Sequence, residues 1–295
     1  MLSGRATKNR LQQTIAGRAS VAGFGYWSGK DVRIEFRPAP IGSGVTFVRS
    51  DLGSHARIPA TIASQVDSPR RTNLRCGGVM VEMVEHVLAA LAGLQVDNCE
   101  VWTDHAEMPG CDGSAASFVD AILRARIVEQ GAPAPRIDVT ETVRVCEGET
   151  WIEAHPADDD QLHIEFQLDY PTAPVIGRQV ARATVTPETF RRELSTCRTF
   201  VLEHEVEQFK RQGLGLRVTS RDLLVFSENG PLENRLRFPN ECARHKSLDV
   251  LGDLALAGCR VSGRVIAHRS GHRLHAALTR QLMERFATAP LRATA

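Results

Sequence analysis

The sequence predicts an α+β protein with two similar domains, each containing a β-sheet and helices. Its 295 residues exceed what one hydrophobic core usually organises, and 42% of them are hydrophobic, which is enough to fill two cores. In each half, strand-like segments are followed by segments with helical spacing of apolar residues. This repeated order predicts two domains of the same class.

The first half contains both strand and helix patterns. Residues 14–47 form short strand-like runs that are interrupted by glycine, as in GFGYWSG and IGSG. Residues 79–94 carry apolar side chains at helical spacing. The segment GCDGSAASFVDAIL, residues 110–123, includes a serine suited to cap a helix, followed by apolar positions at i, i+1, i+4 and i+5. We expect a mixed α and β unit.

A proline-rich segment divides the chain into the predicted domains 1–132 and 133–295. GAPAPR, residues 131–136, holds two prolines, one glycine and two alanines between patterned segments. The second half then repeats the order of the first. Its expected elements are strands at 137–145 and within 151–168, a helix from about Pro187, a strand at 222–226 and a helix at about 240–257.

Composition excludes several classes of protein. The formal net charge of +1 gives no electrostatic footprint for nucleic acid. The seven cysteines are scattered without a CxxC pair, which favours free thiols in a reducing compartment. The N-terminus lacks the apolar run of a secretory signal, and nowhere do about 18 apolar residues follow one another. We expect a cytoplasmic protein with no transmembrane segment and no nucleic-acid partner.

The segment ARHKSLDVLGDLALAG, residues 243–258, is the strongest candidate for a reactive helix. His245, Asp249 and Asp253 are four residues apart, so a helix projects them from one side. Such a side can present an imidazole and a carboxylate to a metal ion. The alternative is an exposed ion pair between His245 and Asp249, which is common on solvated helix faces.

A second candidate helix, VEMVEHVLAALAG at residues 81–93, has Glu85 and His86 in an otherwise apolar run. Burial of both groups costs several kcal/mol unless they are paired or bind a metal. The alternative is a surface glutamate beside a core histidine. Because a hydrolytic zinc site uses three protein ligands and one water, His86, His245 and Asp249 form the candidate ligand set.

Two shorter segments supply candidate catalytic groups. HRSGHRLH, residues 268–275, places three histidines around a glycine turn, and His272 could act as a general acid whose pKa is raised by Asp253. The alternative is a set of basic surface residues, an interpretation that we favour for His275. In CRTF, residues 197–200, Thr199 could donate a hydrogen bond to an oxyanion.

Five ordered blocks together resemble the UDP-3-O-acyl-N-acetylglucosamine deacetylases. They are MVEHVLAALAG, EMPGCDGSAASFV, CRTF, RHKSLDVLGDLAL and SGH, and the similarity extends from TIAGRASVAGFGYWSG to SGHRLHAAL. The resemblance implies zinc-dependent hydrolysis of the N-acetyl group of UDP-3-O-(3-hydroxyacyl)-N-acetylglucosamine. The products would be acetate and the free amine, in the committed step of lipid A synthesis. The implied fold places the helices between two sheets, with the active site at the domain junction.

The same resemblance implies a role for each matched catalytic residue. One Zn²⁺ per chain would be held by His86, His245 and Asp249, with iron(II) as a possible metal in the cell. Glu85 would be the general base that takes a proton from the attacking water. Thr199 and protonated His272, oriented by Asp253, would stabilise the oxyanion, and His272 would then protonate the leaving amine.

Substrate contacts are also implied. They are Lys246, which would meet the phosphates, Asp169 and Tyr170 near the uridine, and Phe200 and Arg269. An apolar passage for the acyl chain is expected within residues 179–213. The only expected partner is this small molecule, met in the cytosol or by transient contact with the inner leaflet, and the protein is expected to be a monomer.

The sequence departs from the family pattern at two places. Tyr26 and Trp27 stand where the family commonly has a Leu-His pair, and Cys111 stands where Ile or Met is usual. Two alternatives follow: a zinc amidohydrolase of the same fold for a different acylated sugar, and a noncatalytic sugar-nucleotide-binding relative. Retention of Glu85 argues against the second, since a binder needs no general base. The length leaves no room for a fused dehydratase domain, so we expect a single activity.

Overall fold

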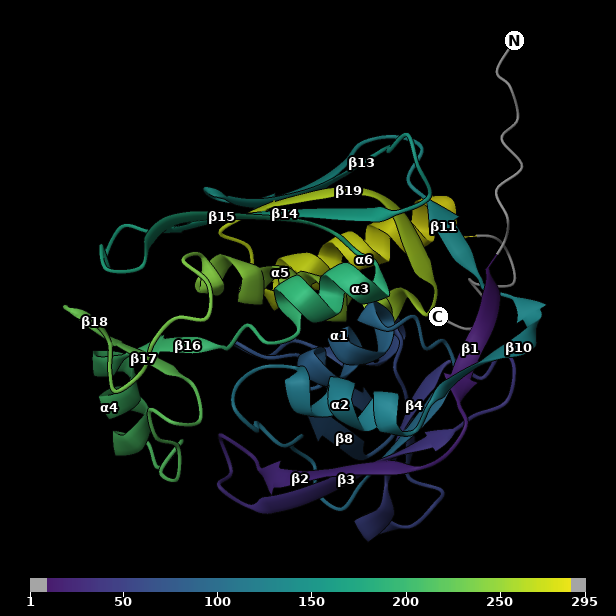
Figure 1. Ribbon diagram of the computed structural model, residues 1–295, viewed down its shortest axis with the longest axis horizontal. Coiled ribbons are helices and arrows are strands. Elements are labelled where there is room, and N and C mark those ends of the chain that lie inside the picture. The colour runs from purple at the N-terminus through teal and green to yellow at the C-terminus, as the bar shows by residue number, and fades with distance from the viewer. Residues whose placement is uncertain (1–9, 288–295) are drawn as a thin grey trace.

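Two main β-sheets enclose a layer of helices (Figure 1). The computed structural model describes residues 10–287. The lower sheet in the view comes from the first half of the chain and the upper sheet from the second. Each sheet buries one face against the helices, so the cores meet in the central layer. The predicted α+β class, with helices between two sheets, is confirmed.

The first main sheet has five strands in the order β2-β3-β9-β4-β5. In β3 the buried side chains of Val32, Ile34 and Phe36 alternate with more exposed neighbours, the period-two pattern of a strand with one face on a core. β4 and β9 are parallel, and the other neighbours are antiparallel. The strands are β2 Ala19–Phe24, β3 Asp31–Pro38, β4 Val45–Arg49, β5 Arg57–Pro59 and β9 Cys99–Thr103.

The second main sheet repeats the topology of the first. Its order is β12-β13-β19-β14-β15, again with one parallel pair, β14 and β19, among antiparallel neighbours. A short additional strand, β11, pairs parallel with β19. The strands are β11 Arg136–Asp138, β12 Val143–Glu147, β13 Thr150–His155, β14 Leu162–Tyr170, β15 Gly177–Thr184 and β19 Arg260–His268. The similarity of the two halves that the sequence predicted is therefore present in the strand order.

The principal helices occupy equivalent positions in the two halves. One helix precedes the last strand of each main sheet, and another follows it. In the first half these are α1 Glu85–Gly93 and α2 Ala116–Arg124. In the second they are α5 Glu241–Leu254, extended by a 3₁₀ turn at Ala255–Ala257, and α6 His272–Phe286.

α1 and α5 approach each other very closely. A side chain at Gly252 of α5 would meet the backbone carbonyl oxygen of Glu85 at 2.1 Å, so only glycine permits this packing. α1 is buried on nearly all sides, which explains its almost continuous apolar sequence. The two helices that carry the candidate ligands are therefore held against each other in the centre of the molecule.

The remaining elements form three small sheets and short helices. In Figure 1, α4 and the strands β16 to β18 lie at the left, and β1 and β10 lie at the right. The paired strands are β1 Leu11–Ile15 with β10 Ile127–Pro133; β6 Gln65–Val66, β7 Asn73–Cys76 and β8 Val79–Glu82; and β16 Phe200–Leu202, β17 Leu224–Ser227 and β18 Gly230–Pro231. The helices are α3 Pro187–Thr189, continued by a π-helical turn Phe190–Leu194, α4 Glu203–Arg211, and 3₁₀ turns at Ser50–Leu52 and Ile62–Ser64.

Two predicted elements were wrong in extent. Residues 79–94 are not one helix, because Val79–Glu82 pairs with Asn73–Cys76 as a hairpin, and Met83, at φ 59°, separates strand from helix. Residues 137–145 are not one strand, because β11 pairs with β19 whereas β12 pairs with β13. The strand that each segment pairs with decides the boundary in both cases. For β8 this is the neighbouring strand β7, joined by a turn, and for β11 it is the distant strand β19.

Two further local features differ from expectation. α2 begins after Ala115, which has no side-chain cap. Ser114, one residue earlier, accepts the Ala116 N–H on its Oγ at 3.2 Å and donates to Asp112 at 2.7 Å. In the predicted linker, residues 131–133 belong to β10, which pairs with β1, and the next strand, β11, pairs with the second main sheet. The division between residues 132 and 133 stays a prediction.

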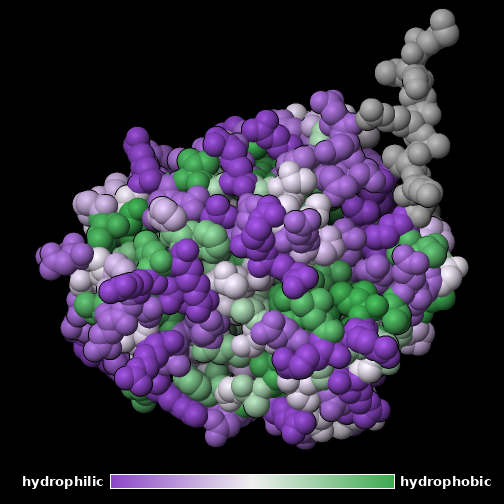
Figure 2. All heavy atoms as spheres, viewed as in Figure 1, coloured by the Kyte–Doolittle hydropathy of each residue, from purple (hydrophilic) through white to green (hydrophobic). Residues whose placement is uncertain are grey.

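Hydrophilic side chains cover most of the face seen in Figure 2, with apolar patches between them. Within residues 10–287, no helix is long and apolar enough to cross a membrane. All seven cysteines are free thiols, as the sequence predicted.

Candidate metal centre and active site

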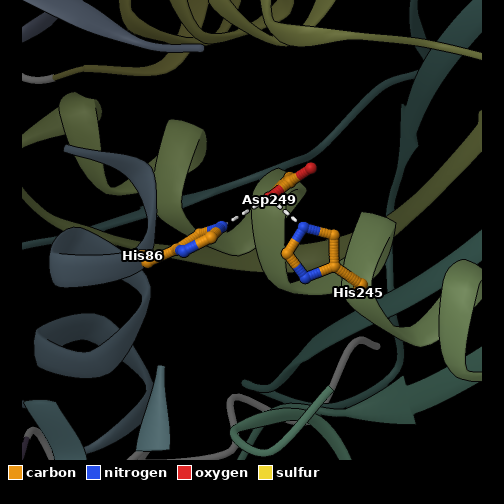
Figure 3. A group of neighbouring side chains, drawn as sticks. All are labelled: His86, His245 and Asp249. Carbon is orange, nitrogen blue, oxygen red and sulfur yellow. Dashed lines mark ion pairs between the residues drawn. The ribbon is translucent and has the colours of Figure 1, made fainter. Parts of the chain in front are cut away.

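His86 near the start of α1 and His245 and Asp249 of α5 converge in the buried layer between the sheets (Figure 3). Asp249 Oδ1 lies 3.6 Å from His86 Nε2 and 3.4 Å from His245 Nε2. The rings of the two histidines are edge to face, with centroids 5.0 Å apart. All three side chains are buried, so the alternative of an exposed ion pair on α5 is wrong.

These three residues fit a metal ion. Tetrahedral zinc ligands at about 2.0–2.1 Å lie roughly 3.3 Å from one another, close to the separations observed. Asp249 Oδ1 is buried and has no hydrogen-bond partner among residues 10–287. An orphaned carboxylate oxygen costs free energy, and a cation between the two imidazoles would satisfy it. The two-nitrogen, one-oxygen donor set suits zinc.

Hydrogen bonds and charges around the candidate ligands favour binding of a cation. His245 Nδ1 donates to the carbonyl of Cys197 at 3.0 Å, which leaves Nε2 as the lone-pair donor. Burial lowers the pKa of His245 to about 4, so it is neutral. Burial opposes ionisation of Asp249, but the Lys246 ammonium, 2.6 Å from Oδ2, and the imidazoles hold its pKa well below the usual range. Lys246 thus donates to the candidate ligand Asp249 and also lines the adjoining cavity.

Glu85, the first residue of α1, is buried beside this centre with an exposed fraction of 4%. The alternative of a surface glutamate is therefore wrong. Its Oε2 accepts the backbone N–H of Thr72 at 3.0 Å. Burial raises the pKa of Glu85, which makes the carboxylate a better proton acceptor.

Asp253 and His272 form a buried pair next to Glu85. His272 Nδ1 lies 2.8 Å from Asp253 Oδ2, and Thr72 Oγ1 donates to Asp253 Oδ1 at 2.5 Å. Burial disfavours the imidazolium, but the Asp253 carboxylate overcomes it and raises the pKa of His272 to about 9. Burial likewise opposes ionisation of Asp253, whose pKa the two neighbouring imidazoles lower to about 2. A pKa of about 9 corresponds to a protonated His272 at neutral pH.

A second group of potential metal ligands, Asp253, His272 and His275, is better explained by hydrogen bonds. The Nδ1 atoms of both histidines lie 2.8 and 2.7 Å from the same carboxylate oxygen. These separations are shorter than those between two ligands of one zinc ion and are typical of charge-assisted hydrogen bonds.

A cavity of about 910 Å³ opens onto these groups. Such a volume is suited to a large small-molecule ligand. All of the residues nominated from the sequence line it except Asp253, which lies behind His272. The structure thus brings together segments from both halves of the chain around one cavity.

One part of the cavity wall carries the residues predicted to contact substrate. Tyr170 and Phe200 meet edge to face, with centroids 5.7 Å apart. Asp169 pairs with Arg178 at 3.1 Å, and Arg269, at φ 52°, pairs with Glu149 at 3.2 Å. Thr199 is fixed through its backbone, whose N–H donates to the carbonyl of Gly113 at 2.8 Å.

Another part of the wall is apolar. Its residues include Val206, Phe209, Leu214, Val218 and Leu223. Val206 and Phe209 fall within the predicted passage at 179–213, whereas the other three follow it in the chain. The acyl passage stays a prediction, but apolar side chains line the same cavity as the candidate metal centre.

Tyr26 and Trp27, the departure from the family pattern, lie in this wall. The Tyr26 hydroxyl donates to the carbonyl of Asp222, and its ring packs on Gly110, where any side chain would clash. The Trp27 ring meets Phe209 edge to face at 5.1 Å. Tyr26 and Trp27 therefore give the apolar wall a different shape from the one that a Leu-His pair would give.

Sequence reasoning missed three residues of the site: Thr72, Ser270 and His275. His275 is fully buried, so the interpretation as a basic surface residue was wrong. The reason is that α6 packs on α5 and points this side chain at Asp253. His268 is partly buried and stacks on Trp151. Thr72 lies in no recognisable pattern, whereas the three-residue spacing of His272 and His275 could have suggested one helix face.

Comparisons with known proteins identify the family of this chain. The family model of UDP-3-O-acyl N-acetylglycosamine deacetylase matches residues 12–284. The chain is 39% identical over 273 residues to the UDP-3-O-acyl-N-acetylglucosamine deacetylase of Anaeromyxobacter sp. (strain Fw109-5), covering 92% of this chain and 88% of the relative. It is 38% identical over 273 residues to the deacetylase of Psychrobacter cryohalolentis, covering 92% and 85%. The chain belongs to the UDP-3-O-acyl N-acetylglycosamine deacetylase family.

Proposed function

We propose that this enzyme hydrolyses the N-acetyl group of UDP-3-O-(3-hydroxyacyl)-N-acetylglucosamine to give acetate and the free amine, the committed step of lipid A synthesis. The observation that carries the proposal is Asp249 Oδ1, which lies between His86 and His245 without a hydrogen-bond partner in the described part of the chain, with Glu85 and His272 on the same cavity. A metal site beside a buried base and a buried acid is the arrangement that metal-assisted amide hydrolysis requires. The printed names of the relatives support the substrate.

His86, His245 and Asp249 would hold the metal, for which we propose Zn²⁺, one per chain, with iron(II) as a second possibility in the cell. When bound, the metal polarises the acetamide carbonyl and makes water more acidic. Lys246 keeps Asp249 Oδ2 occupied, so Oδ1 stays directed at the imidazoles. The ligand set is therefore oriented before a metal arrives.

Glu85 and His272 divide the proton transfers between them. Glu85, whose pKa is raised by burial, takes the proton from the attacking water. His272, whose pKa is about 9 because Asp253 outweighs its burial, begins as the cation, stabilises the oxyanion and then protonates the leaving nitrogen. Thr199, on the cavity wall, is proposed to donate to the same oxyanion.

We propose that different residues of the cavity wall contact the two ends of the substrate. The apolar wall that contains Val206 and Phe209 would receive the acyl chain, and Tyr170 and Phe200 would contact the uridine. Asp169, Lys246 and Arg269 would bind polar groups of the nucleotide. We further propose a cytoplasmic monomer that meets this substrate in the cytosol or in transient contact with the inner leaflet.

Mass spectrometry of the substrate tests the proposal. UDP-3-O-(3-hydroxyacyl)-N-acetylglucosamine is incubated with zinc-loaded protein, with His86→Ala as the blank. Loss of one acetyl group with the intact protein alone supports reaction, substrate and metal dependence together. No loss at several acyl lengths, from a folded and metal-loaded sample, rejects this substrate and favours a different acylated sugar, with the wall at Tyr26 and Trp27 as the cause.

The activity is expected to decline at alkaline pH because His272 must be protonated. Its pKa is raised to about 9, so the acid form is present below that pH and is lost as the pH rises through it. At one pH unit above this value, kcat should be about tenfold lower. The pH profile of kcat at saturating substrate checks this. An alkaline decline centred near the ordinary histidine pKa would show that Asp253 does not set the proton affinity of His272.

A further inference from the structure

Behind His272, a second histidine contacts the same carboxylate. His275 lies one turn further along α6 and has an exposed fraction of 0%. Its Nδ1 is 2.7 Å from Asp253 Oδ2, the oxygen that also accepts from His272 Nδ1. The proposed proton transfers do not involve His275, although it is buried and both of its ring nitrogens have hydrogen-bond partners.

We propose that His275 is a positioning residue for the deacetylation: it holds Asp253 in the orientation that fixes His272, and it stays neutral so that His272 alone carries the proton. This inference rests on the proposed role of His272 as the acid of the reaction.

Hydrogen bonds hold the Asp253 carboxylate in place. Three hydrogen-bond donors surround its carboxylate: Thr72 on Oδ1 at 2.5 Å, and both imidazoles on Oδ2. Thr72 comes from the first half of the chain and α6 from the second. A carboxylate held from two sides cannot rotate away from His272. Removal of the His275 donor leaves Oδ2 with one partner and removes the packing on that side.

His275 and His272 differ in the hydrogen-bond partner of the second ring nitrogen, which bears on which imidazole carries the charge. His275 Nε2 lies 2.9 Å from Ser270 Oγ, which is itself buried. With Nδ1 donating to Asp253, the neutral ring presents Nε2 as an acceptor, and the Ser270 hydroxyl can donate to it. In this arrangement both ring nitrogens of a neutral His275 have a hydrogen-bond partner.

The two rings respond differently to their surroundings. Burial lowers the pKa of His275 and outweighs the Asp253 carboxylate, which raises it, and the His272 cation and the Lys246 ammonium add to the lowering. His272 faces the carboxylates of Glu85 and Asp249 in addition to the shared Asp253. The proton therefore lies on His272, the histidine of the two that lines the cavity.

The test compares His275→Leu with His275→Asn in the zinc-loaded full chain. Leucine removes the donor, whereas the side-chain amide of asparagine can put an N–H close to the position of Nδ1. We expect His275→Leu to lower kcat by about 10–100-fold, the usual effect of losing a group that orients a ligand or a catalytic residue, with little change in KM. His275→Asn should recover most of the loss.

A second measurement requires no substrate. The downfield proton resonance of the hydrogen bond between His272 and Asp253 should be lost or displaced in His275→Leu and retained in His275→Asn. The resonance remains informative even if the wild-type protein does not deacetylate the proposed substrate. The proposed function and the proposed role of His275 can therefore fail separately. Thermal unfolding of both variants shows whether they fold.

Two outcomes overturn the inference. One is a folded His275→Leu protein with wild-type kcat and an unchanged resonance. The other is equal loss of kcat and of the resonance in both variants, because the donor to Asp253 would then not be what matters. If His275→Leu does not fold, the asparagine variant decides alone: loss of its resonance overturns the proposal, and retention supports it.

Discussion

Replacement of Glu85 by glutamine is expected to lower kcat by about 10²–10⁴-fold while the protein keeps its metal. Glutamine has the same size and can still accept the backbone N–H of Thr72, which bonds Glu85 Oε2 at 3.0 Å. It cannot take a proton from water. Because Glu85 is not among the three converging ligands, its loss should spare metal binding. Single-turnover rates and metal content by mass spectrometry check both parts.

Glu82→Gln is the matched control for this variant. Glu82 lies three residues earlier, at the end of β8, where it pairs with Arg71 at 3.2 Å and does not line the cavity. Its replacement should leave kcat within about twofold of wild type, since the pair is partly exposed and contributes little. Near wild-type turnover in Glu85→Gln would show that another group accepts the proton.

The candidate ligands illustrate what spacing along the chain can and cannot predict. His245 and Asp249 are four residues apart on α5, so the helical period alone places them on one face. His86 comes from α1, and nothing in local spacing brings it to them. That contact requires the close approach at Gly252, which depends on the packing of the two halves. The requirement of a hydrolytic zinc site for three protein ligands, and not the spacing, added His86 to the candidate set.

The same limit explains the elements and contacts that were missed. Thr72 bonds Asp253 across 181 positions and His272 across 200, so no window of sequence contains both partners. His275 belongs to a basic segment that resembles a surface turn, and only the packing of α6 on α5 buries it. Helical and strand periods, in contrast, predicted the repeated order of elements, because that order is a local property of each half.

Replacement of Asp249 by asparagine is expected to remove the metal. The variant keeps the shape of the side chain, and its carbonyl oxygen can still accept from Lys246, which lies 2.6 Å from Asp249 Oδ2. It loses the negative charge and the unpartnered oxygen between His86 and His245. Metal affinity should fall by at least about 100-fold, more than the loss of a group that only orients a ligand. Competition with a chelator measures this, and activity should follow metal content.

Asp253→Asn distinguishes the two buried groups that could hold a cation. If the metal lies at His86, His245 and Asp249, this variant should retain metal within about twofold but lose kcat, because His272 loses the carboxylate that keeps it protonated. The 2.7 and 2.8 Å contacts of the second group argue that it holds a proton rather than a metal ion. Loss of metal in Asp253→Asn and retention in Asp249→Asn would reverse that assignment and place the metal beside His272 and His275.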